Sequence, residues 1–226
     1  MSPDFLERLA YIAPVLLFAM VAHEYAHGYA AMKQGDMTAY QLGRLTWNPI
    51  KHIDPMMTVI VPLVTIMTSG VAFGGAKPVP VQPRNYRHYK RGDIIVSLAG
   101  VATNLVIALA SAVLIALLGA LGAALPGAGP TIAILQRMLD ISIVINLVLV
   151  AFNLIPLPPL DGSHVFKYLL PPAWSLNYQR LGAYGFILLF LLITVGRPLL
   201  SAWMRPALIV AGALRGLVAP FMVLGA

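Results

Sequence analysis

The stretch His23-Glu24-Tyr25-Ala26-His27 brings two imidazoles and a carboxylate together at a spacing that suits metal chemistry. Residues four apart lie on one face of a helix, so His23 and His27 can direct a ring nitrogen at the same point. Glu24 projects about 100° around the helix from His23, within reach of a water at the metal but outside its ligand set. We therefore predict a zinc site with His23 and His27 as ligands and Glu24 as the general base.

The surroundings of this stretch strengthen the prediction, because it lies inside an apolar run at residues 9–32. Ionisable side chains within an apolar span are costly, and each of them needs a buried partner. The alternative is that both histidines are polar residues whose hydrogen bonds are satisfied between packed helices. One metal ion shared by these side chains satisfies them together, so fewer separate buried partners are needed.

The composition indicates a polytopic membrane protein. Of the 226 residues, 59% are hydrophobic and 10% are charged, against roughly 25% charged in soluble domains, and the mean hydropathy is +0.83. The chain has no cysteine, so any zinc must be held by histidine and carboxylate. The net charge of +7 comes from basic residues that flank the apolar runs, which is typical of topology signals and not of nucleic-acid binding.

We expect an all-α polytopic membrane protein with about five spanning helices, one re-entrant segment at 56–70 and a short β-like hairpin or strand near 73–83. The run at 56–70 is shorter than the roughly 20 residues of a span and is interrupted by Pro62. We expect one membrane-embedded domain over 1–226, with a catalytic core at about 9–168 and C-terminal helices at about 178–226. The predicted spans lie at 9–32, 94–125, 132–157, 184–195 and 199–224, and the weaker span at 184–195 extends back towards residue 181.

Asp161 is the best acidic candidate for a third ligand. Three prolines before it stop the preceding helix, and Gly162 leaves the backbone free to turn the carboxylate inward. On the local sequence alone, an aspartate in a turn is an equally good interpretation. For Asp161 to reach the depth of the two histidines, the run at 56–70 must enter and leave the membrane on one side.

The distribution of positive charge agrees with this topology. With 56–70 re-entrant, most lysines and arginines before residue 181 lie on one side, and the connection between the spans at 94–125 and 132–157 has only Arg137, near the start of the second span, on the other. The positive-inside rule then places the N-terminus outside and the active site toward the cytosolic half. We expect a multi-pass protein of a prokaryotic plasma membrane.

Four motifs in order along the chain resemble the site-2 protease family of intramembrane zinc metalloproteases. They are His23-Glu24-Tyr25-Ala26-His27, Gly43-Arg44-Leu45-Thr46-Trp47-Asn48-Pro49, Ala76-Lys77-Pro78-Val79-Pro80-Val81, and Asn153 through Asp161-Gly162. The resemblance covers roughly residues 9 to 168. Two departures stand out, because Val101 and Ser163 occupy positions where the family often has Pro and Gly.

The resemblance implies one zinc ion held by His23, His27 and Asp161, with Glu24 as the catalytic base, and cleavage of transmembrane segments of other proteins. Asn153 stands at a family position associated with the active site, where a neutral donor could stabilise an oxyanion. Its alternative role is a hydrogen bond between helices, and for Asn104 and Asn146 we prefer that structural interpretation.

The segment at 73–83 is a candidate for substrate binding. Pro78 and Pro80 remove N–H groups from one edge of an extended chain, while Lys77, Val79 and Val81 keep theirs on the other. An unwound substrate could pair with that edge by β-augmentation. A proline-rich loop without such a role is the alternative.

The expected partners are a transmembrane protein substrate, the lipid bilayer and a regulatory membrane partner, without nucleic acid. The competing function is a metal-binding membrane protein that does not cut, either a transporter or an inactive protease-like binding module. A transporter would be expected to show related halves, which this chain lacks. Glu24 argues against an inactive relative, because such a protein could lose the base and keep its ligands.

Overall fold

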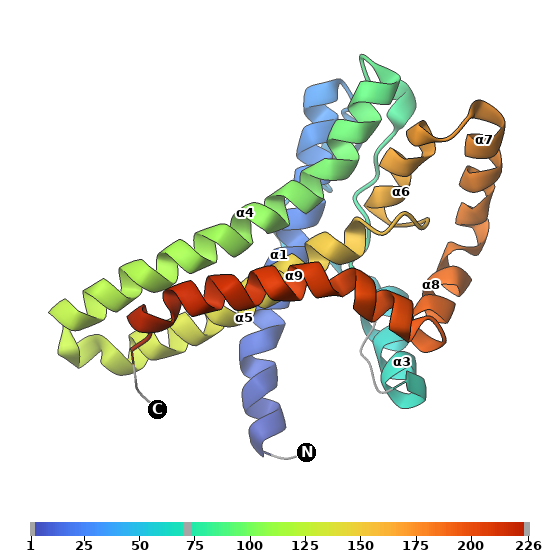
Figure 1. Ribbon diagram of the computed structural model, residues 1–226. Coiled ribbons are helices and arrows are strands. Elements are labelled where there is room, and N and C mark those ends of the chain that lie inside the picture. The colour runs from blue at the N-terminus through green and yellow to red at the C-terminus, as the bar shows by residue number, and fades with distance from the viewer. Residues whose placement is uncertain (1–2, 70–73, 224–226) are drawn as a thin grey trace. The chain divides into compact units, whose positions relative to one another are not determined.

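The computed structural model describes residues 3–69 and 74–223, which are mostly helical (Figure 1). Short helical turns and irregular segments connect the helices. The α-helices are α1 (Pro3–Gln34), α2 (Thr38–Gln41), α3 (Val61–Ser69), α4 (Tyr89–Ala124), α5 (Gly129–Asn153), α6 (Asp161–Phe166), α7 (Pro172–Arg180), α8 (Gly185–Thr194) and α9 (Arg197–Val218).

Within the described residues, five helical segments are long and apolar enough to cross a membrane. This confirms the prediction of a helical chain with about five segments able to span a membrane. The fourth segment combines α7, a short 3-10 turn and α8. The segments are Glu7–Gln34, Tyr89–Ala124, Gly129–Asn153, Pro172–Thr194 and Arg197–Phe221.

The run predicted to be re-entrant forms a π-helix at Pro55–Ile60 that continues into α3. Asp54 caps its start, because Oδ1 accepts hydrogen bonds from the N–H groups of Met56 and Met57 at 2.9 and 3.0 Å. The apolar helix is shorter than a full span. Its re-entrant path stays a prediction, and residue 70 lies outside the described residues.

The prediction of a β-like hairpin or strand near 73–83 is not supported. Residue 73 lies outside the described residues, and residues 74–82 are irregular, with no strand partner in the described part of the chain. The physical reason is that N–H groups here bond to other acceptors. Lys77 donates to the His52 carbonyl at 2.7 Å, and Val79 and Gln82 donate to side-chain carboxylates. No N–H ladder remains for a strand.

The chain divides into two compact units. The first comprises Met1–Ala19, Asn104–Val150 and Met204–Ala226, and the second comprises Met20–Thr103 and Ala151–Trp203. The assignment of one domain over 1–226 stays a prediction. Every residue of the predicted site belongs to the second unit, as His23 and Asp161 illustrate.

The first unit has an apolar core and also contains buried polar side chains that hydrogen-bond to one another. The Asn104 side chain donates to Oδ1 of Asn146 at 2.8 Å, and both residues are fully buried. Such buried amides must be paired, which agrees with the structural interpretation of these two asparagines. The core is formed by Ala108, Ala112, Ile115, Ile143, Leu147, Ala211 and Val218.

Candidate metal centre

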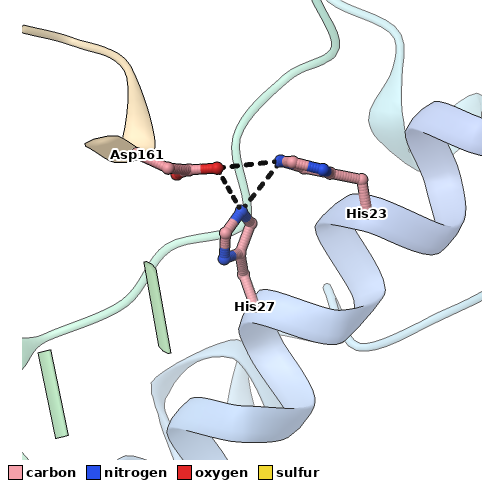
Figure 2. A group of neighbouring side chains, drawn as sticks. All are labelled: His23, His27 and Asp161. Carbon is pink, nitrogen blue, oxygen red and sulfur yellow. Dashed lines mark hydrogen bonds and ion pairs between the residues drawn. The ribbon is translucent and has the colours of Figure 1, made fainter. Parts of the chain in front are cut away.

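Helix α1 presents His23 and His27 on successive turns, as the spacing predicted (Figure 2). Their Nε2 atoms lie 3.0 Å apart, and the rings meet edge to face with centroids 4.6 Å apart. Both side chains are largely buried, at 10% and 12% exposure. The helix thus brings two ring nitrogens to one point away from bulk water.

Asp161 reaches the same point as the first residue of α6. Figure 2 shows its carboxylate directed between the two rings, with Oδ2 3.2 Å from Nε2 of His23 and 3.3 Å from Nε2 of His27. Gly162 fits where a Cβ would collide with the Leu154 carbonyl. The connection after α5 therefore folds tightly against the start of α6 and sets the position of Asp161.

Helix α4 supports the two histidines from another side. The Val96 carbonyl oxygen lies 2.7 Å from Nδ1 of His27, and because a carbonyl only accepts, Nδ1 carries a proton and Nε2 is the ring nitrogen left for a metal. A Cβ at Gly100 would lie 2.6 Å from Nε2 of His23 and of His27. Only glycine leaves room for both rings at this turn of α4.

The three residues have the chemistry and spacing of a zinc site. Zinc bonds of about 2.0–2.2 Å at a tetrahedral angle separate ligand atoms by about 3.3–3.6 Å, close to the observed 3.0, 3.2 and 3.3 Å. Oδ2 of Asp161 is buried and accepts no hydrogen bond, a cost that a bound cation removes. Among the described residues, His23, His27 and Asp161 form the group able to hold a metal ion.

Glu24, next to His23 in α1, contacts the segment at 74–82. Its Oε2 accepts a hydrogen bond from the Val79 N–H at 2.8 Å. A carboxylate that accepts one hydrogen bond still has lone pairs free to take a proton. The predicted base is therefore oriented by the same segment that was predicted to bind substrate.

Two side chains hold that segment in place. The Arg44 guanidinium donates to the carbonyl oxygens of Lys77 and Pro78 at 3.0 and 3.3 Å. Asp36, fully buried just after α1, accepts hydrogen bonds from the N–H of Gln82 at 2.6 Å and from the Asn85 amide at 2.9 Å. Burial alone would raise the pKa of Asp36, but these hydrogen bonds and those from Thr38 lower it below its ordinary value. The carboxylate thus stays charged and keeps its donors.

The other predicted site residues are not part of the histidine–aspartate group. Asn153 is half-buried at the last residue of α5, and its catalytic role stays a prediction. In the segment at 74–82, Lys77 is exposed, Val79 is buried and Val81 is half-buried. The N–H groups of Lys77 and Val79 bond within the chain, so they do not form the free edge that the sequence suggested.

Two residues of α4 contact the histidines without having been predicted to do so. The Val96 carbonyl is a backbone group, and no sequence signal marks it. Gly100 carried a usable signal, because a glycine inside a long apolar helix often marks a close approach by another element.

The known proteins that resemble this chain share one description in their names, that of a zinc metalloprotease. Over 187 residues the chain is 39% identical to "Putative zinc metalloprotease YwhC" of Bacillus subtilis, covering 83% of this chain and 81% of that protein. It is 27% identical over 208 residues to "Putative zinc metalloprotease Rip2" of Mycolicibacterium smegmatis, covering 89% and 75%. The Rip2 protein of Mycobacterium tuberculosis is 27% identical over 187 residues, covering 83% and 67%. No protein-family model matches the chain, and no solved structure gives a significant match.

Proposed function

The chain belongs to the zinc metalloprotease family of Bacillus subtilis YwhC, and from this membership we propose that it hydrolyses peptide bonds within or near transmembrane segments of membrane proteins. The main observation in support is that His23, His27 and Asp161 converge at one point. Both histidines lie on an apolar helix long enough to span a membrane. The names of the relatives confirm the prediction of zinc. We propose that this family is the site-2 protease family, whose motifs the chain resembles.

In this proposal, His23, His27 and Asp161 hold one zinc ion. The donor set of two imidazoles and one carboxylate is known in catalytic zinc sites, which keep the fourth position open. Zinc in such a site supplies Lewis-acid activation of water and of the scissile carbonyl. The hydrogen bond from Nδ1 of His27 to the Val96 carbonyl would leave Nε2 as the nitrogen that binds zinc.

Glu24 and Asn153 perform the proton and charge chemistry of the proposed reaction. The Glu24 carboxylate takes a proton from the attacking water and delivers it to the leaving amine. The Asn153 amide donates a hydrogen bond to the developing oxyanion without adding charge inside the membrane. Loss of this donor would lower the rate without removing the metal.

We also propose the orientation that the charge distribution predicts. The N-terminus lies outside the cell, and the centre opens toward the cytosolic half of a prokaryotic plasma membrane. Water then reaches Glu24 from the side on which the polar loops gather. A transmembrane protein is the substrate, and a membrane partner regulates access.

The segment at 74–82 is proposed to bind the unwound substrate through its backbone. Because the Val79 N–H donates to Glu24 in the structure, a substrate carbonyl that pairs with this N–H must replace the carboxylate. Substrate binding and release of the base are then one event. Val81 extends the same contact along the segment, and Lys77 joins it where its N–H exchanges the His52 carbonyl for a substrate carbonyl.

Replacing Val79 with Pro should abolish cleavage with zinc retained, because proline removes the N–H that pairs with the substrate. Cleavage of a single-span reporter and zinc content of the purified variant measure the two effects. Val79→Ala is the matched control, since it keeps the N–H and shortens only the side chain. Cleavage by Val79→Pro at the parent rate would refute this role for the segment.

The proposed function is tested by metal removal from the purified protein in detergent. With a panel of single-span reporter proteins, we expect the parent to cut at least one reporter within or near its span. A chelator should stop the cleavage, and added zinc should restore it. If the parent binds zinc but cuts no reporter, a non-proteolytic binding module becomes the better interpretation. Cleavage of soluble peptides alone would contradict specificity for transmembrane segments.

A further inference from the structure

Lys167, six residues after the metal-site residue Asp161, forms a buried ion pair with Asp93. Nζ of Lys167 lies 2.6 Å from Oδ2 of Asp93, and the two side chains are only 9% and 3% exposed. Lys167 begins the 3-10 turn directly after α6, whereas Asp93 lies near the start of α4. The pair therefore joins α4 to the short helix that begins at Asp161.

Two further side chains from the same stretch converge on Asp93. The Tyr168 hydroxyl donates to Oδ2 of Asp93 at 2.8 Å, and Nδ1 of His164 lies 3.4 Å from Oδ1. Burial, the hydrogen bond and the charge of Asp93 raise the pKa of Tyr168 above its ordinary value, so its hydroxyl remains a donor. Asp93 thus accepts a hydrogen bond from Tyr168, pairs with Lys167 and lies close to His164, all three of which follow Asp161.

The same face of α4 contacts both histidines. Asp93, Val96 and Gly100 follow one another at spacings of three and four residues, so they lie in one stripe along the helix. Val96 fixes His27 through its carbonyl, and Gly100 lies against the Nε2 atoms of both histidines. One stripe of α4 therefore contacts the histidines of α1 and also the residues that follow Asp161.

From this stripe we propose that Asp93 and Lys167 are positioning residues of the metal centre, whose ion pair fixes the start of α6 and the Asp161 carboxylate relative to His23 and His27. The inference rests on the ligand set in the proposed function. Stability alone is a poor reason for such a pair, because apolar residues of similar volume often stabilise a buried site as well or better. Holding Asp161 in position would explain why the ion pair between Asp93 and Lys167 is buried.

The test measures zinc affinity by competition with a chelator and the visible absorption bands of the cobalt-substituted protein. Asp93→Asn and Lys167→Met should each weaken zinc binding about 10- to 100-fold, the usual effect of losing a group that orients a ligand, and should alter the cobalt bands. Asp140→Asn is the matched control, because Asp140 pairs with Arg215 in the other compact unit. Its zinc affinity should equal that of the parent.

The double variant Asp93→Asn/Lys167→Met separates positioning from folding. It leaves no buried charge unpaired, so its unfolding temperature should recover relative to the single variants. Under our proposal its zinc affinity stays weakened and its cobalt bands stay altered. A double variant with the zinc affinity and cobalt spectrum of the parent would overturn the positioning role. Neither readout involves proteolysis, so a parent that binds zinc but cuts no substrate would refute the proposed function alone.

Discussion

Glu24→Gln should lose cleavage by about 10²–10⁴-fold, the usual contribution of a general acid–base group, while it keeps the zinc content of the parent. The amide has nearly the shape of the carboxylate but cannot take a proton from water. Its oxygen can still accept the hydrogen bond from Val79 that Oε2 of Glu24 accepts in the parent. The local structure is therefore kept, and the loss isolates the proton transfer.

The measurement is single-turnover cleavage of a reporter that the parent cuts, together with metal analysis of the same preparation. We expect the loss in the single-turnover rate constant at saturating enzyme, because proton transfer by the base lowers the barrier of the chemical step. Glu7→Gln is the matched control, since Glu7 lies on the same helix and pairs with Arg137 at 3.0 Å. Cleavage by Glu24→Gln at the parent rate would remove Glu24 from the mechanism.

Gly100→Ala should weaken zinc binding by at least the 10- to 100-fold that follows loss of an orienting group. The added Cβ would lie 2.6 Å from Nε2 of both His23 and His27, closer than carbon and nitrogen atoms can approach. Both rings or the helix α4 must then move. Because the collision falls on the atoms that face the metal, the substitution acts directly on the ligand geometry.

A chelator competition measures this effect without a substrate. The matched control is Gly212→Ala in α9, where an added Cβ meets no atom within 4 Å. Alanine in a helix is favourable by up to about 1 kcal/mol over glycine, so this control should fold at least as well as the parent with unchanged zinc affinity. Parent-like zinc affinity in Gly100→Ala would show that α4 yields without disturbing the rings.

The failure to predict the segment at 74–82 has an identifiable cause. The alternation of proline and valine indicated an extended chain in which the prolines lack N–H groups. It could not reveal which acceptors the remaining N–H groups would find, since Glu24, Asp36 and the His52 carbonyl approach from distant parts of the sequence. Extended backbone without a ladder partner is not a strand.

The sequence by itself determined the helical membrane class, the zinc chemistry and the pair His23 and His27. These depend on local properties, since apolar length defines a span and a spacing of four residues defines a helical face. Asp161 was reachable from sequence only because the histidines lacked a third ligand.

The tertiary structure decided how α4 serves the centre. The contacts of Val96 and Gly100 with α1, and of Asp93 with α6 and the turn that follows it, depend on which turns of distant helices meet. No local pattern encodes such a meeting, because it arises from the packing of whole helix surfaces against one another. The local spacing therefore predicted the ligands His23 and His27, whereas long-range packing determined which groups orient them.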